Sequence, residues 1–197
     1  GSGNLLGGEQ SGHIAGVGFD LYVRLVGEAV AEYKGEKSEI ESEVKVDLPV
    51  DAHLPHDYIP GERLRLEAYR KLAGVTTSEE LAQVREEIRD RYGNPPEPVE
   101  NLFAVAAFRV RARGAEVTEV SLQGRQVRFA PMRLPESKVM RLQRLYPGAM
   151  YKQAVDVVLV PRPSTARVAG QPLRDTALLD WAAGFLDALA PEPARAP

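Results

Sequence analysis

Close to the N-terminus, the chain has glycines at a spacing typical of phosphate-binding loops. Gly7, Gly8 and Gly12 are followed directly by His13 and Ile14. A loop that holds ATP needs Lys and then Ser or Thr at those last two positions, because the amine reaches the outer phosphates and the hydroxyl binds Mg²⁺. The substitution of both groups predicts that this chain binds neither ATP nor Mg²⁺ here. We expect no cofactor for the chain itself.

Metal and catalytic chemistry have few candidate residues. His53 and His56 are three residues apart, with Asp57 beside them, but Pro55 lies between them in a segment that reads as extended. They therefore do not share one helix face, as the histidines of helical zinc sites do. The chain has no Cys, which excludes a thiolate nucleophile and any Cys-ligated zinc. No Ser/His/Asp triad or carboxylate pair stands out, so the residues do not indicate an enzyme.

Charge is distributed unevenly along the sequence. Residues 1–104 have 20 acidic and 11 basic side chains, whereas residues 105–152 have 3 acidic and 10 basic side chains. A basic block of this kind contacts phosphates in many nucleic-acid-binding proteins, but it is also typical of an ordinary solvated face. The candidates for phosphate contacts are Arg109, Arg113, Arg125 and Arg128. Few aromatic side chains accompany them, and a single-strand binder would need such side chains for base stacking.

A second candidate surface is the acidic helix predicted over residues 78–92. Leu81, Val84 and Ile88 form its inward face, which leaves a set of acidic side chains pointing outward. These side chains either form a solvent face stabilised by pairs such as Glu87 with Arg91, four residues apart, or dock a basic partner.

Helical periodicity predicts the elements that position these residues. Apolar side chains recur every three or four residues, and glycines or prolines end each run. Thr77 followed by Glu80 is a capping-box signature at the start of the acidic helix. The predicted helices span residues 19–33, 63–72, 78–92, 135–146 and 178–189, and a further helix carries residues 99–110 and ends at Gly114.

Strand patterns separate these helices. Residues 44–48 alternate apolar and charged side chains up to Pro49, which ends the strand or confines it to a sheet edge. Residues 117–122 and 125–129 flank Gln123-Gly124 as a hairpin, and residues 155–160 form a β-branched run. We predict an α+β fold, with a small mixed sheet of about four to five strands packed with about five helices and preceded by a helical appendage.

The expected domain organisation follows from composition. Residues 34–39 are polar and lack apolar periodicity, so we expect an N-terminal segment of residues 1–39, a main domain of residues 40–190, and a disordered Pro/Ala tail of residues 191–197. No apolar run approaches the roughly 18 to 20 residues of a membrane span, and the first residues do not form a signal peptide. We expect a soluble intracellular protein.

Several motifs resemble one family. Residues 3–13 (GNLLGGEQSGH) and 18–22 (GFDLY) resemble the translocation motif shared by the bacterial transcription-repair coupling factors (the Mfd family) and the branch-migrating helicase RecG. Residues 54–60 (LPHDYIP) and 87–93 (EIRDRYG), with Arg63-Leu64 and Tyr69-Arg70 between them, resemble the C-terminal domain peculiar to the coupling factors. The specific motifs cover residues 3 to about 115.

The resemblance implies a place for this chain in a larger machine. Coupling factors are cytoplasmic, ATP-driven double-stranded-DNA translocases that displace stalled RNA polymerase and recruit the excision-repair protein UvrA. The resemblance implies that residues 1–39 are the end of the motor, in which Gln10 couples hydrolysis to movement, and that residues 40–190 are the regulatory TRCF domain. The arginine that the family places before the first glycine is absent. ATP and Mg²⁺ would act only in the parent protein.

The same resemblance implies a role for the acidic helix. The family's C-terminal domain packs on an N-terminal UvrB-like module, hides the UvrA-binding surface and restrains ATPase activity. Glu87, Asp90 and Arg91 occupy the matching docking positions. The leading hypothesis is therefore an autoinhibitory interaction domain without activity of its own, and the alternative is a nucleic-acid-binding module that uses residues 109–152.

Overall fold

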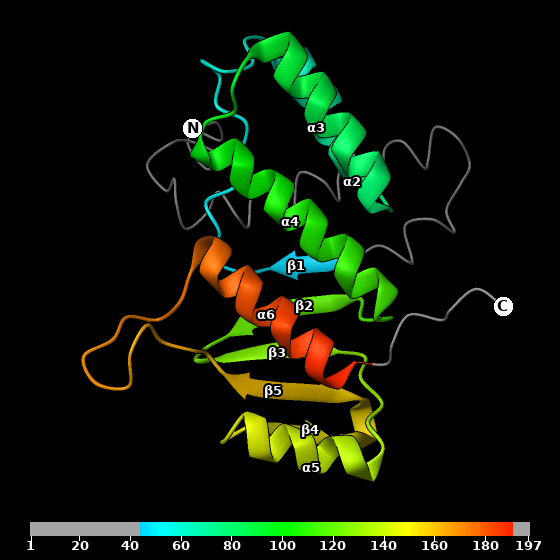
Figure 1. Cartoon of the computed structure of the whole chain (residues 1–197), viewed down its shortest axis with the longest axis vertical. Helices are drawn as coiled ribbons and strands as arrows, with labels where there is room; N and C mark the ends of the chain where they lie inside the picture. The colour runs from blue at the N-terminus through cyan, green and yellow to red at the C-terminus, as the bar shows by residue number, and fades with distance from the viewer. Residues whose placement is uncertain (1–43, 191–197) are drawn as a thin grey trace, which may run out of the picture. The chain divides into compact units, whose positions relative to one another are not determined.

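The computed structural model describes residues 44–190, which divide into two compact units (Figure 1). Among these residues, unit 1 is Pro49–Val110, and unit 2 combines Val44–Leu48 with residues 111–190. The fold is α+β, as predicted, with five helices and a five-stranded sheet in the described part. Gln10, the expected helix at residues 19–33, the linker and the tail at residues 191–197 lie outside the described residues.

The sheet of unit 2 has the strand order β1-β2-β3-β5-β4. Strand β1 runs parallel to β2, and every other neighbouring pair is antiparallel, so the sheet is mixed. The strands are β1 Lys45–Asp47, β2 Glu119–Gln123, β3 Gln126–Ala130, β4 Met150–Lys152 and β5 Val157–Pro161.

Alternating side chains explain the central hairpin. Val127 and Phe129 of β3 are fully buried, whereas the residues between and beside them are partly exposed. Gly124 forms the turn with a φ of 61°, a left-handed conformation that glycine adopts without strain. The predicted hairpin is confirmed, and β1 lies at the sheet edge, as Pro49 indicated.

Two helices cover the sheet of unit 2. Helix α6 (Asp175–Leu189) lies across one sheet face in Figure 1, and its Phe185 ring stacks on Phe129 with centroids 4.1 Å apart. Tyr146, at the end of helix α5 (Glu136–Leu145), meets Phe185 edge-on with centroids 5.0 Å apart. This aromatic cluster holds sheet, α5 and α6 together.

Unit 1 is helical. Helix α2 (Glu62–Ala73) packs against helix α3 (Ser78–Tyr92), and both are followed by helix α4 (Glu97–Gly114), which continues from unit 1 into unit 2 at Arg111. The predicted helix start is confirmed with Thr77 as the N-cap, because the Glu80 backbone N–H donates to Thr77 Oγ1 over 3.1 Å, while the Glu80 carboxylate accepts from the Thr76 hydroxyl over 2.9 Å.

The sequence prediction differs from the structure near β5. Residues 153–155 form a short 3₁₀ helix, so the strand predicted from residue 155 begins at Val157 instead. Strand β4, three residues long and at the sheet edge, was not predicted. A segment this short gives too few residues for an alternating pattern to be recognised.

Candidate functional site

The acidic helix α3 is anchored on one side and open on the other. Ile88 is buried, and Leu81 and Val84 are half-buried, so the predicted apolar face points into unit 1. Because the apolar side chains recur every three or four residues, they lie on one side of the helix, and the charged side chains occupy the rest of its surface.

The three candidate docking residues have different surroundings. Glu87 pairs with Lys71 of helix α2, and both side chains are 44% exposed. The pair between Glu87 and Arg91, which the solvent-face alternative used as its example, is not formed: Arg91 instead lies over the Tyr92 ring, with its guanidinium carbon 5.3 Å from the ring centroid. Packing of α2 against α3 brings Lys71 within reach of Glu87, and no pattern within the α3 sequence contains that information.

The third candidate, Asp90, is exposed and has no hydrogen-bond or ion-pair partner among the described residues. The same holds within residues 44–190 for Glu79 and Glu86 of the same helix. Each of these carboxylates retains its full capacity to accept hydrogen bonds from a cationic partner. Helix α3 therefore presents negative charge that unit 1 itself does not neutralise.

A shallow, solvent-open hollow lies between α2 and α3. Apolar side chains and charged side chains line it together, and the candidates Glu87 and Arg91 are among them. The full lining is Leu64, Glu67, Ala68, Lys71, Glu87, Ile88, Arg91 and Tyr92. The candidate docking surface therefore includes part of α2.

Contacts in the middle of the acidic helix and at its C-terminal end hold it in place. In the middle, Arg85 pairs with Glu100 of α4 over 3.0 Å and lies over the Phe103 ring at 5.6 Å. At the C-terminal end, the Tyr58 hydroxyl donates to the Gly93 carbonyl over 2.7 Å. Burial, with smaller contributions from Glu100 and Tyr92, raises the pKa of Tyr58 above its ordinary 10.0.

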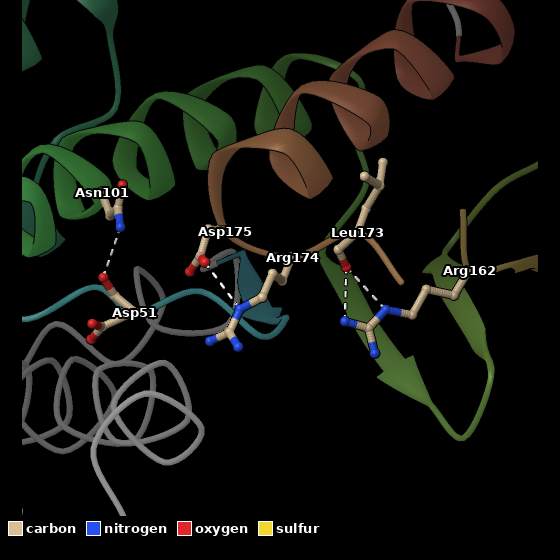
Figure 2. A network of polar contacts seen from close by, with 6 residues as sticks. All are labelled: Asp51, Asn101, Arg162, Leu173, Arg174 and Asp175. Carbon is tan, nitrogen blue, oxygen red and sulfur yellow. Dashed lines mark hydrogen bonds and ion pairs between the residues drawn. The ribbon is translucent and has the colours of Figure 1, made fainter. Parts of the chain in front are cut away.

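The segment that contains His53 and His56 is held by contacts within unit 1. His53 Nδ1 lies 2.9 Å from Asp51 Oδ1, and the Asn101 side-chain amide donates to the Asp51 carbonyl over 2.9 Å (Figure 2). His56 is exposed. Within residues 44–190, no group of three or more His, Cys, Asp or Glu side chains is placed to hold a metal ion. In the same residues, no helix is long and apolar enough to cross a membrane.

The basic block is partly occupied by contacts within unit 2. Arg128 pairs with Glu119 over 2.7 Å, and Arg111 pairs with Asp187 over 2.7 Å. Of the other candidates, Arg113 at the end of α4 and Arg125 at the hairpin turn are exposed. Arg109 is half-buried on α4 and engaged in a contact.

Comparison with known proteins identifies the class. The family model of the TRCF domain matches residues 48–142. A crystal structure titled as the C-terminal domain of transcription-repair coupling factor superposes with a TM-score of 0.56 at 16% identity, covering 74% of this chain and 93% of that one. The fold and the family model together define a TRCF-domain protein.

Curated relatives give the family. The transcription-repair-coupling factor of Mycobacterium bovis is 46% identical over 205 residues, covering 98% of this chain and 17% of the relative. The Bacillus subtilis factor is 42% identical over 118 residues, covering 59% of this chain and 10% of the relative. The chain belongs to the transcription-repair-coupling factor family, and it spans about a sixth of the length of its Mycobacterium relative.

Proposed function

We propose that this chain is the autoinhibitory docking domain of a bacterial, cytoplasmic, ATP-driven double-stranded-DNA translocase that displaces stalled RNA polymerase and recruits UvrA. Its partner is the N-terminal UvrB-like module of the same protein, whose UvrA-binding surface it masks. The observation that carries this proposal is the exposed α3 face, on which Asp90 and Glu86 have no partner within the described residues.

The physical argument concerns charge. A surface that binds an acidic partner is basic, and a mask for that surface must present acidic groups in a compatible arrangement. Asp90 meets an incoming cation without first giving up an existing contact, whereas Glu87 shares its carboxylate with Lys71. Arg91 adds a donor group with a fixed position against Tyr92. The face therefore contributes both attraction and orientation.

In this proposal, the chain itself has no catalytic residues, and ATP and Mg²⁺ bind elsewhere in the parent protein. Gln10, which lies outside the described residues, takes the coupling role. Its substitution in the parent protein should impair translocation along DNA while leaving ATP hydrolysis largely intact. The two activities are measured by a triplex-displacement assay and by phosphate release.

The alternative, a nucleic-acid module based on residues 109–152, has less support. Arg128 and Arg111, which lie in this segment, already have carboxylate partners in unit 2. Lys138 and Arg141 donate to the backbone carbonyls of Ala190 and Ala188. Charge that stabilises a fold is less available to phosphates, because each new contact must replace an existing one.

The test of the docking proposal is the change of Glu87, Asp90 and Arg91 together to Ala in the parent protein. Loss of about 2 to 3 kcal/mol of docking energy raises the undocked population by tens-fold or more. We expect higher basal ATPase activity and UvrA binding without polymerase, with an unchanged melting temperature. A matched control replaces Glu136, Asp180 and Arg144, two acidic residues and one basic residue that are exposed on unit 2.

If the triple variant melts normally but keeps low ATPase activity and does not bind UvrA, α3 is not the mask. Equal activation by the control variant would also contradict the proposal, because it would show an effect of surface charge in general.

A further inference from the structure

A group of arginines lies at one end of the sheet in unit 2. The segment from residue 161 to residue 174 joins β5 to α6 and contains three arginines and no acidic residue. The turn between β2 and β3 adds a fourth, because the Arg162 backbone N–H donates to the Arg125 carbonyl over 2.8 Å. This arginine group consists of Arg125, Arg162, Arg167 and Arg174.

The loop that carries the group has a defined shape. Its two arms pair through a bridge between Ser164 and Pro172 and through the Thr165 N–H, which donates to the Gln171 carbonyl over 2.8 Å. Gly170 passes so close to Ala166 that an added Cβ would lie 2.3 Å from the Ala166 carbonyl oxygen. Such an approach admits only glycine. The tip is therefore a fixed turn, and it displays Arg167 to solvent.

The base of the loop is fixed by Arg162. Its Nε and Nη2 both donate to the Leu173 carbonyl, at 3.0 and 2.8 Å (Figure 2). Arg174 Nε pairs with the Asp175 carboxylate over 3.0 Å. Among residues 44–190, the remaining terminal nitrogens of both guanidinium groups have no partner. Each arginine is thus held by one edge and keeps free donors.

Two of these like charges lie near each other, and within residues 44–190 the ion pair formed by either of them is the one between Arg174 and Asp175. Burial, and then the charge of Arg174, lower the pKa of Arg162 below its ordinary range. Asp175 is the acidic neighbour, and one carboxylate does not balance the group. An anion placed between the guanidinium groups would relieve their repulsion, which favours an anionic partner at this end of unit 2.

We propose that the arginine group is a contact surface for the phosphate backbone of duplex nucleic acid. Guanidinium groups pair with phosphate oxygens through two parallel N–H donors, and the exposed Ser164 and Thr165 hydroxyls on the same loop are further donors of the kind found at phosphate contacts. Val168 is the one large hydrophobic side chain exposed on the loop, and the other exposed apolar residues are Ala and Pro, so the loop has little apolar area for a protein interface. This role goes beyond the docking function proposed for α3.

The test measures binding of the 197-residue chain to a fluorescein-labelled 20-base-pair duplex by anisotropy between 25 and 200 mM salt. The variant Arg125→Gln/Arg167→Gln/Arg174→Gln removes three exposed charges and leaves Arg162 to hold the loop. We expect its affinity at 50 mM salt to fall by about tenfold or more. The slope of log affinity against log salt should fall by about 2 to 3, since each phosphate contact contributes about 0.9.

A matched control removes three other exposed charges of unit 2, as Arg113→Gln/Arg144→Gln/Lys152→Gln. It should bind like the unmodified chain, and both variants should keep its melting temperature. An equal loss in both variants would overturn the proposal, as would no binding of the unmodified chain at 25 mM salt. If polyglutamate competes as well as unlabelled duplex at equal charge, the surface is for an acidic protein and the nucleic-acid assignment is wrong.

Discussion

Helix α3 in unit 1 and the basic block in unit 2 are both rich in charge, but the structure uses the two sets of charges differently. On α3, Glu79, Glu86 and Asp90 have no partner among the described residues. In unit 2, Lys138 and Arg141 of α5 donate to backbone carbonyls at the end of α6. The first set is therefore available to a partner, whereas the second stabilises the fold.

This difference shows why charge counts alone do not locate an interface. A basic side chain that caps a helix or pairs with a carboxylate is counted like a free one in the sequence, although its energetic role is different. The useful quantity is the unneutralised charge on a rigid element. Helix α3 and the arginine group have such unneutralised charge, whereas most of the central basic block does not.

The largest effect on the free energy of unfolding is expected when the charged side chains that stabilise unit 2 are removed. Changing Lys138 and Arg141 together to Met removes two donors from the C-terminal carbonyls of α6. We expect the free energy of unfolding to fall by about 1 to 2 kcal/mol, measured by urea denaturation. The control Arg113→Met/Arg144→Met, at exposed positions, should change it by less than about 0.5 kcal/mol.

The corresponding change on α3 should leave the fold intact and weaken docking. In the variant Glu86→Gln/Asp90→Asn, two carboxylates become amides of the same shape, and neither has a partner to lose within the described residues. We expect unfolding free energy within about 0.5 kcal/mol of the original. Affinity for the N-terminal module, measured by calorimetry, should fall about three- to tenfold. A destabilisation above about 1 kcal/mol would mean that these charges serve the fold after all.

A smaller change in docking affinity, an increase instead of a decrease, is expected when Lys71 is replaced. This basic residue neutralises part of the charge on α3. Lys71→Met frees the Glu87 carboxylate and removes a positive charge facing a basic partner. Docking should tighten about two- to fivefold, the equivalent of one exposed ion pair. Lys71→Arg keeps the pair and should bind like the original. Weaker binding of Lys71→Met would indicate that the lysine positions Glu87 for docking.

The smallest effect concerns pH. Burial, and then the charge of Asp187, raise the pKa of Tyr146 above its ordinary 10.0 in folded unit 2. The folded state therefore holds this proton more tightly than the unfolded state, so the contribution is complete below pH 10 and is lost as pH rises through the folded pKa. The variant Tyr146→Phe has no hydroxyl to ionise, so it does not lose this contribution to stability at high pH. We expect the stability difference between the variant and the original to grow in the variant's favour above about pH 10, as followed by thermal melting.

Much of the fold was predictable because periodicity reports burial. The Thr77 N-cap, the Gly124 hairpin and the apolar face with Ile88 were each encoded within a few residues. The partner of Glu87 was not predictable, because Lys71 approaches it only through the packing of two helices. The sequence after Pro161 gave no sign that this segment brings Arg162 beside the turn at Arg125.

Strand β1 has a mechanical consequence. It is a three-residue strand that precedes all of Pro49–Val110 in the chain, and in the described part of the chain its one strand neighbour is β2, which it meets through Lys45, Val46 and Asp47. Tension that arrives from the residues before Val44 therefore loads this short ladder before it loads the rest of unit 2. Rupture of this three-residue ladder would detach the sheet edge without breaking the pairing of the β2–β3 hairpin or the stacking of Phe129 on Phe185.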